Sequence, residues 1–305
     1  MAGEFDFISW LRARSSGGSR VLVGPGDDTA VLAPGARPQL VTVDMLMDGT
    51  DFHLAEVGAR AAGRKAMSAN LSDIAAMAGV PTAAVVSVAL PRTGGRELGE
   101  QLYLGLRDVA DAFGVPIVGG DTNSWDHPLA VSVTVLGEAT DRGPVLRSGA
   151  KPGDWLLVTG PLGGSIRGKH LTFTPRVREA LRLHECAELH AMIDISDGLA
   201  ADLNHILEES RCGAVLKADA IPISSDAVEL SRTSGKSALQ HALGDGEDFE
   251  LIAAVSPADG ERLIREQPVS GITLAKVGEC VDAGLWLEER GARTKLEPAG
   301  WVHAM

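Results

Sequence analysis

Two patterns of apolar residues alternate along the chain. Some stretches carry apolar residues at helical spacing over several turns, whereas shorter apolar runs bounded by Gly, Pro and Asp are typical of strands. In the first half, these patterns predict helices over residues 4–14, 54–77 and 97–113. They predict strands over residues 83–90 and 129–137, a short apolar stretch ending at Asp121, and a hairpin of residues 29–32 and 39–44 joined by the turn 34–38.

The second half continues this alternation. Helices are predicted over residues 175–190 and 198–210, and strands over residues 154–159, 214–217, 249–255, 271–277 and 285–288. Strands that alternate with helices predict an α/β or α+β fold. Residues 142–153 are polar and rich in turn formers, and 305 residues exceed what one hydrophobic core usually serves. We therefore expect two domains, residues 1–145 and 146–305.

Composition and charge narrow the functional classes. The hydrophobic share of 45% and the charged share of 23% are ordinary for a soluble enzyme, and 4% aromatic residues argue against base-stacking surfaces. A net charge of −13 opposes binding to nucleic acid or to an anionic membrane. The three cysteines share no CxxC spacing, and neither a signal segment nor a membrane-spanning run is apparent. We expect a cytoplasmic protein without nucleic-acid or membrane partners.

Aspartates gather in five short motifs along the chain. Most of these motifs close an apolar run or open a helix, so their carboxylates are expected at strand ends, where several could converge on a hard cation bound through oxygen. Magnesium there would also remove the objection that an acidic protein repels nucleotides. The motifs are Gly26-Asp27-Asp28, Thr42-Val43-Asp44, Asn70-Leu71-Ser72-Asp73, Gly119-Gly120-Asp121-Thr122 and Asp194-Ile195-Ser196-Asp197-Gly198.

Each motif also has an ordinary structural explanation. Gly and Asp favour tight turns for backbone reasons, and Ser196 or Asp197 could simply cap the helix that follows. The pair Arg147 and Lys151 could be solvated charges or could bind a phosphate tail. The chain has no GxxxxGK[ST] loop, no HRD or DFG motif and no HExxH spacing, so Walker-type nucleotide binding and zinc chemistry find no support.

Taken in order, the motifs resemble the thiamine-monophosphate kinase family over nearly the whole chain. The resemblance also uses residues 147–154 (Arg-Ser-Gly-Ala-Lys-Pro-Gly-Asp) and residues 246–251 (Gly-Glu-Asp-Phe-Glu-Leu). That family belongs to an ATP-binding superfamily with aminoimidazole ribonucleotide synthetase and selenophosphate synthetase. The resemblance implies an N-terminal mixed sheet that binds ATP and magnesium and pairs across a homodimer into a barrel, followed by a C-terminal α/β sandwich.

The resemblance also implies roles for individual residues. It implies several magnesium ions bound by acids and nearby oxygens, at Asp27, Asp28, Thr42, the main chain of Val43, Asp44, Asp73, Asp121, Asp194 and Asp197. It assigns ATP to Tyr103, Gly120, Asp121, Arg147 and Ser196, and thiamine monophosphate to Asp51, Glu247 and Trp301. Catalysis would depend on Asp44, Asp121 and Arg147.

The most important departure from the family pattern lies at residue 51. The family's Asp-Gly-x-His-Phe stands here as Asp48-Gly49-Thr50-Asp51-Phe52, so a carboxylate replaces the histidine that approaches substrate. A carboxylate can pair with a cationic thiazolium or bind metal, but it cannot donate to phosphate as an imidazolium does. The choice of acceptor substrate therefore depends on what Asp51 does.

The implied reaction needs no general base. A phosphate monoester has a second pKa of ~6, so the acceptor is largely dianionic at neutral pH. The barrier is the repulsion between this dianion and the triphosphate, about 4 kcal/mol per charge pair at ~4 Å and an effective dielectric of ~20. Magnesium would offset that repulsion in a direct in-line transfer. Two alternatives stay open: a synthetase of the same superfamily acting on an amide or on selenide, and a noncatalytic nucleotide-binding or calcium-binding module, although the chain has no EF-hand loop.

Overall fold

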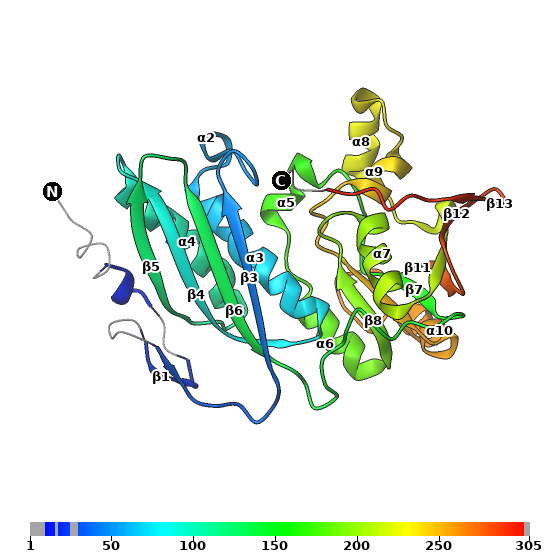
Figure 1. Ribbon diagram of the computed structural model, residues 1–305, viewed down its shortest axis with the longest axis horizontal. Helices are drawn as coiled ribbons and strands as arrows, with labels where there is room; N and C mark the ends of the chain where they lie inside the picture. The colour runs from blue at the N-terminus through cyan, green and yellow to red at the C-terminus, as the bar shows by residue number, and fades with distance from the viewer. Residues whose placement is uncertain (1–9, 16–17, 25–29, 302–305) are drawn as a thin grey trace. The chain divides into compact units, whose positions relative to one another are not determined.

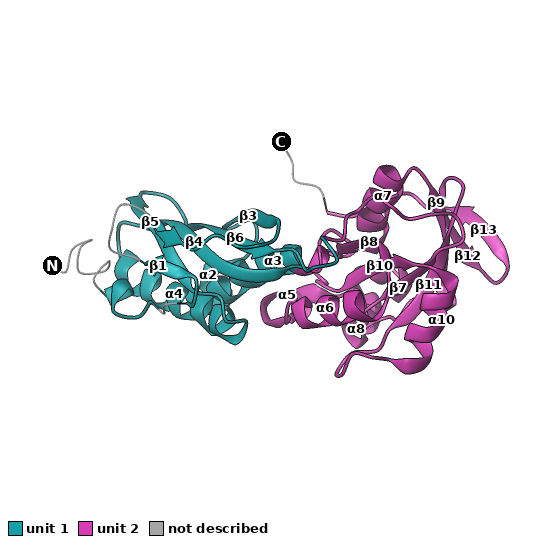
Figure 2. Ribbon diagram, turned by 90° about the horizontal axis from the view of Figure 1, so that it is seen from below, with its two compact units in different colours: residues 1–74, 79–143 teal, residues 75–78, 144–305 magenta. Residues whose placement is uncertain are grey.

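The computed structural model describes residues 10–15, 18–24 and 30–301. The chain divides into two compact units, residues 1–74 with 79–143 and residues 75–78 with 144–305 (Figure 2). Each unit is built around its own sheet. A mixed α/β fold of two units is therefore confirmed.

Unit 1 contains a four-stranded mixed sheet in the order β3-β6-β4-β5. Its strands are β3 (Gln39–Met47), β6 (Ala130–Glu138), β4 (Val80–Pro91) and β5 (Ile117–Trp125). Only the β4–β5 pair is parallel. The helices α3 (Ala59–Ala76) and α4 (Gly95–Ala112) lie behind this sheet in Figure 1, and a short helix α2 (Leu54–Val57) precedes them. One face of the sheet is thus covered by helices.

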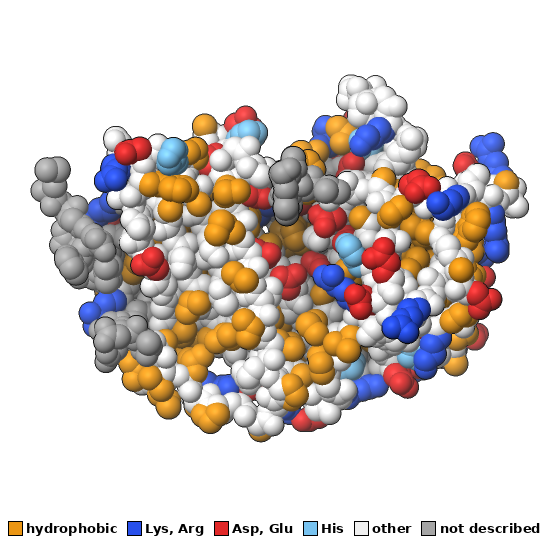
Figure 3. Space-filling model, viewed as in Figure 1, with side chains coloured by type: hydrophobic (Ala, Val, Ile, Leu, Met, Phe, Trp, Pro, Cys, Tyr) orange, Lys and Arg blue, Asp and Glu red, His pale blue; other side chains and the backbone are white. Residues whose placement is uncertain are grey.

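The opposite face of this sheet is apolar and exposed. Residues of β3 alternate, so that Leu40 and Leu46 are buried while the side chains between them face outward. Hydrophobic side chains gather over this face in Figure 3. Those on β3, which we call the open-face stripe, are exposed by 65%, 61%, 62% and 41% at Val41, Val43, Met45 and Met47. A row of large apolar side chains in water is a feature of interaction surfaces.

Unit 2 contains a seven-stranded sheet in the order β13-β12-β9-β11-β7-β10-β8, in which only β12 and β9 pair in parallel. The helix α7 (Leu199–Ser210) packs on one face with Leu156 and Val158 of β7 (Trp155–Val158). Gly260 of α10 (Pro257–Glu266) lies against Trp155 on the other face. The strands are β7 (Trp155–Val158), β8 (Leu189–Asp194), β9 (Gly213–Lys217), β10 (Leu251–Val255), β11 (Ala275–Val281), β12 (Leu285–Glu289) and β13 (Ala292–Lys295). The helices are α5 (Lys169–Thr172), α6 (Val177–Cys186), α7 (Leu199–Ser210), α8 (Ser225–Ser234), α9 (Ala238–Gly244) and α10 (Pro257–Glu266).

Several sequence-based predictions of local structure were wrong. The hairpin of residues 29–32 and 39–44 does not form, because β2 (Val31–Leu32) pairs with β1 (Val21–Val23) and β3 pairs with β6. The helix predicted over residues 54–77 is interrupted at Gly58, whose φ of 77° is incompatible with a helix. The helix predicted over residues 175–190 ends at Cys186, and α8, α9 and α10 were missed. Most of the helix predicted over residues 4–14 lies outside the described residues.

Candidate functional site

An acidic cluster lies on the helix-covered side of the unit 1 sheet. Asp44 projects from β3, and the Thr42 hydroxyl donates a hydrogen bond of 2.5 Å to the Asp73 carboxylate on α3. Asn70 of the same helix accepts the Asp44 N–H at 3.2 Å. Burial, followed by the charges of Asp73 and Asp51, raises the pKa of Asp44 to about 7. The sequence motifs around residues 44 and 73 therefore do meet.

Asp51 is held in the turn that follows β3. Its carboxylate accepts the Met47 N–H at 2.7 Å, and the buried Lys65 donates to its main-chain oxygen at 2.5 Å. At the position where the family has a histidine, the Asp51 carboxylate thus accepts a hydrogen bond from a main-chain N–H. An imidazolium could not do this, because both of its nitrogens are donors. Its negative charge also acts on Asp44.

The acidic cluster suits a hard divalent cation. Its ligand atoms are carboxylate, hydroxyl and amide oxygens. The negative charges of Asp73 and Asp51 disfavour ionisation of Asp44 unless a cation is near. Within the described parts of the chain, however, no three His, Cys, Asp or Glu side chains are close enough together to hold a metal ion. Asp27 and Asp28, two of the predicted ligands, lie outside those parts.

Asp121 lies far from this cluster within the same unit. The pairing of the four strands aligns Asp44 of β3 with Val133 of β6 and Gly120 of β5, and these residues face the helices. It aligns Asp121 of β5 with Met45 of β3, and these two residues face the exposed side of the sheet. Because β3 and β5 are the two edge strands, three strand spacings of ~4.8 Å separate them by about 14 Å. One unit 1 sheet therefore cannot bring Asp44 and Asp121 to the same ion.

The expectation that these two carboxylates mark strand ends was wrong. Asp44 lies within β3, which continues to Met47, and Asp121 lies within β5, which continues to Trp125. Gly120 and Asp121 are exposed on that edge strand, and Val43 belongs to the open-face stripe. Edge strands leave main-chain oxygens unpaired on their outer side, so both segments offer backbone ligands as well as carboxylates.

The turn between β8 and α7 carries the second group of predicted residues. Asp194 is the last residue of β8 and is buried, and Ser196 and Asp197 follow before α7 begins. The prediction that Ser196 or Asp197 caps this helix was wrong. Instead Asp202, one turn inside α7, accepts the N–H groups of Asp197 and Gly198 at 2.9 and 3.0 Å. Burial raises the pKa of Asp202 to about 7, although those two hydrogen bonds lower it in part.

The predicted substrate residues adjoin this turn. The Glu247 N–H donates to the Ser196 carbonyl at 2.6 Å, and the Trp301 N–H donates to the Asp197 carbonyl at 2.9 Å. The Trp301 side chain is 58% exposed. Unit 2 thus brings together four predicted site residues, namely Ser196, Asp197, Glu247 and Trp301.

Two further predicted residues have contacts of a different kind. Tyr103 on α4 is buried, its hydroxyl lies 3.3 Å from the Ser15 hydroxyl, and the Trp10 ring meets its ring edge-on. Arg147 is exposed beside β8, where the neighbouring Leu146 carbonyl accepts the Met192 N–H at 3.0 Å. The assignment of both residues to ATP stays a prediction.

Sequence reasoning missed a buried network of charged side chains around Glu250, three residues after Glu247. Glu250 accepts two hydrogen bonds of 2.8 Å from Arg176, one of 2.9 Å from Lys169 and one of 2.7 Å from Thr159. Asp248 is wholly buried and accepts the Gly163 N–H at 2.7 Å. The three acids among residues 247–250 were a signal for this network, because they follow the turn-forming pair Asp245-Gly246 and precede the fully apolar strand β10.

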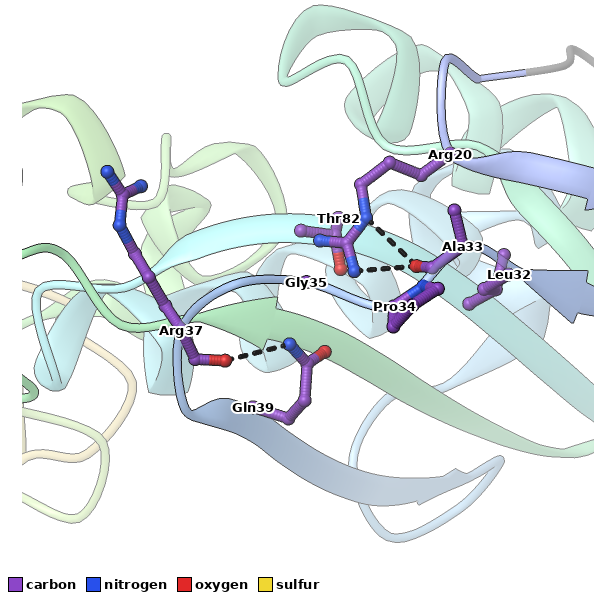
Figure 4. Close-up of a pocket in the computed structure, with 8 residues that line it drawn as sticks. All are labelled: Arg20, Leu32, Ala33, Pro34, Gly35, Arg37, Gln39 and Thr82. Atoms are coloured by element: carbon purple, nitrogen blue, oxygen red, sulfur yellow. Dashed lines mark hydrogen bonds between the residues drawn. The ribbon is translucent and has the colours of Figure 1, made fainter.

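A cavity in unit 1 is lined by none of the predicted site residues. It is lined by Arg20, Leu32, Ala33, Pro34, Gly35, Arg37, Gln39 and Thr82 (Figure 4). Arg20 binds the Ala33 carbonyl and pairs with Glu138, and Arg37 pairs with Asp141 in two hydrogen bonds. Since each arginine already has a carboxylate partner, the cavity offers no free cation to a phosphate.

Comparison with known proteins places the two units in a class. Residues 26–139 match the family described as AIR synthase related protein, N-terminal domain, and residues 151–285 match the corresponding C-terminal domain. The thiamine-monophosphate kinase of Rhodopirellula baltica is 43% identical over 312 residues, covering 98% of this chain and 97% of its own length. The chain belongs to the thiamine-monophosphate kinase family.

Solved structures agree with this assignment. The crystal structure of thiamine-monophosphate kinase from Stenotrophomonas maltophilia has a TM-score of 0.83 and 32% identity, covering 95% of this chain and 98% of that one. The structure named AaThiL complexed with AMPPCP and TMP has a TM-score of 0.77 and 26% identity, covering 99% and 97%. None of the helices in the described parts is long and apolar enough to cross a membrane.

Proposed function

We propose that this protein transfers the γ-phosphoryl group of ATP to thiamine monophosphate, giving thiamine diphosphate and ADP. The observation that carries the proposal is the arrangement of the predicted substrate residues, because Glu247 and Trp301 are hydrogen-bonded through their main chains to Ser196 and Asp197 at one turn. Family membership and the full-length match to the kinases supply the reaction class.

The described residues act by binding and charge placement. The acceptor phosphate is its own nucleophile, so no side chain has to remove a proton. Glu247 and the exposed Trp301 ring would hold the cationic thiamine portion, by charge and by cation–π attraction. Arg147 would stabilise charge on the transferring group.

The acidic residues would hold magnesium. Asp44, Asp73 and Thr42 would bind it in unit 1, Asp194 and Asp197 would bind it in unit 2, and Asp27, Asp28, Asp121 and the Val43 main chain would complete the set. When bound, magnesium neutralises the repulsion between the two phosphate groups. The raised pKa of Asp44 supports this role, because its carboxyl lies near two other acids.

The assay that tests the proposed function is a product analysis. The protein is incubated with ATP, magnesium and either thiamine monophosphate or purine-precursor amides, and the products are separated. Thiamine diphosphate and ADP in equal amounts support the kinase. Release of free phosphate with ADP, or of AMP, on another acceptor would instead indicate a synthetase, and binding of ATP without turnover would indicate a noncatalytic module.

We further propose that the functional protein is a homodimer joined through the open-face stripe. A monomer would leave four large apolar side chains of β3 in water. Pairing two such faces would also bring the β5 edge of one protomer to the β3 edge of its partner if the sheets close into a barrel. The separation of Asp44 from Asp121 within one sheet supports this arrangement, since the β5 edge of a second copy would bring its Asp121 toward the Asp44 edge of the first.

Replacing Met45 with Glu is expected to dissociate the dimer. A charge buried at the middle of an apolar interface without a partner weakens association by about 100-fold or more. Sedimentation at micromolar concentration should give dimers for the wild type and monomers for Met45→Glu. The exposed Val228 of α8 supplies the control, since Val228→Glu should remain dimeric. A wild type that stays monomeric at all concentrations would refute this interface.

A further inference from the structure

The segment that carries Glu247 is held in an unusual backbone conformation. Glu247 has φ of 64° and Phe249 has φ of 49°, so two residues other than glycine adopt left-handed conformations on either side of Asp248. Such conformations persist only when the surrounding structure enforces them. The direction of the Glu247 side chain therefore depends on contacts made by its neighbours.

Hydrogen bonds on one side of the segment come from the β8–α7 turn, and ring packing comes from Phe173, which follows α5. The N–H groups of Glu247 and Phe249 donate to the carbonyls of Ser196 and Ile195 at 2.6 and 2.8 Å. The Phe249 ring stacks on Phe173 with centroids 3.9 Å apart and planes 8° apart. These contacts fix both neighbours of Asp248 but make no use of its side chain.

Asp248 ties the same segment to a glycine turn on the other side. Its Oδ2 accepts the Gly163 N–H at 2.7 Å, whereas its Oδ1 accepts no hydrogen bond from any described residue and lies 3.9 Å from the Lys169 ammonium. Gly163 has φ of 85°, and a Cβ there would come within 2.6 Å of the Ala242 nitrogen. The turn is therefore fixed, and Asp248 connects Glu247 to a rigid support.

We propose that Asp248 is a positioning residue for the acceptor subsite, holding Glu247 in the left-handed conformation from which it binds the thiamine portion of the substrate. The inference rests on the proposed function. It assigns Asp248 no contact with substrate, because the side chain is wholly buried. What the position requires is an acceptor for the Gly163 N–H rather than a negative charge.

An uncharged acceptor is expected to serve because burial already disfavours the carboxylate. Burial raises the pKa of Asp248 to about 7, and the Lys169 charge and the Gly163 N–H lower it only in part. Asn has the same shape and keeps an oxygen for the Gly163 N–H. Ala removes the acceptor and leaves that N–H buried and unpaired, which is the costly outcome.

The experiment compares Asp248→Asn and Asp248→Ala in steady-state kinetics with ATP and thiamine monophosphate. Asp248→Ala should raise KM for thiamine monophosphate by about tenfold or more while KM for ATP changes by less than about twofold, and Asp248→Asn should match the wild type within about threefold. If the Ala variant does not fold, Asp248→Ser tests the same point, since its hydroxyl is too short to reach Gly163.

Asp154 provides a matched control. It is another buried aspartate of unit 2 that accepts a main-chain N–H, from Lys151 at 2.8 Å, but it has no contact with the Glu247 segment. Asp154→Ala should lower stability without separating the two KM values. If it separates them as Asp248→Ala does, or if Asp248→Ala raises both equally, the positioning role is wrong.

Amide hydrogen exchange separates failure of this inference from failure of the proposed function. Exchange at Glu247 and Phe249 should accelerate by about tenfold or more in Asp248→Ala and stay unchanged in Asp248→Asn, whatever substrate the protein uses. Unchanged exchange in Asp248→Ala would overturn the inference. Absence of thiamine monophosphate turnover in the wild type would overturn the function alone.

Discussion

Asp44→Asn and Asp121→Asn are each expected to reduce turnover by about 10²- to 10³-fold or more while the dimer stays folded. The amide keeps the size of the carboxyl but loses the charge that would hold magnesium. Because the two residues lie on opposite edge strands of one sheet, we expect each site to take Asp44 from one protomer and Asp121 from its partner. The measurement is kcat for each purified variant.

Mixing the two inactive variants tests the sharing directly. A dimer of one Asp44→Asn chain and one Asp121→Asn chain has one site with both substitutions and one site with neither. After unfolding and refolding an equal mixture, half the dimers are mixed, so about a quarter of wild-type activity should return. No recovery would contradict a shared site, and near-normal activity of either single variant would contradict the metal role. Asp108→Asn, on the exposed side of α4, should keep full activity.

Glu250→Ala is expected to cost about 3–5 kcal/mol of the free energy of unfolding of unit 2. Glu250 is 1% exposed and is the common acceptor for Arg176, Lys169 and Thr159. Removing it leaves the largely buried Arg176 guanidinium without its bidentate partner. Denaturant unfolding is followed by tryptophan fluorescence in a background with Trp10→Phe and Trp125→Phe, so that the tryptophans of unit 2, namely Trp155, Trp286 and Trp301, give the signal. Loss of less than about 1 kcal/mol would show that the network does not stabilise the fold.

The matched control and the pH dependence sharpen this test. Glu229→Ala removes the exposed pair with Arg232 on α8 and should change stability by less than about 0.5 kcal/mol.

Burial opposes ionisation of Glu250, but the hydrogen bonds and charges of Arg176 and Lys169 outweigh it and hold the pKa of Glu250 below its usual value. This stabilisation is therefore complete above the unfolded-state pKa and is lost as the pH falls through the folded-state pKa. In Glu250→Gln that acid loss should disappear.

The sequence predicted local features better than pairing between distant segments. The β8–α7 turn was predicted because an apolar run, Asp-Ile-Ser-Asp-Gly and a helical pattern follow one another within about twenty residues. The partner of β2 could not be read in the same way, because a two-residue strand carries no register information and its pairing with β1 depends on the rest of the fold. The break at Gly58 was hidden because a single glycine in an Ala-rich run is also tolerated inside helices.

The candidate site shows the same limit. The ordered motifs identified the acids, but the alternation of side chains in β3 and β5 decides on which face of the sheet each acid lies. The sequence did not give these faces, because both strands were predicted to end at Asp44 and Asp121 and in fact continue past them. Glu250 lay within a quoted motif, yet its partners Arg176 and Thr159 lie far away in the sequence. Asp202 was missed because a carboxylate one turn inside a helix usually faces solvent.

The carboxylate of Asp202 also bears on how a nucleotide can approach unit 2. The first turn of a helix ordinarily attracts phosphate, because its N–H groups are free and its dipole is positive there. In α7 the N–H groups of Asp197 and Gly198 already bind a carboxylate from the same helix. A triphosphate at this turn would find these two donors already occupied and would lie beside the acids Asp194 and Asp197. Binding of ATP there should therefore require a divalent cation from the outset, so that metal-free ATP competes poorly with its magnesium complex.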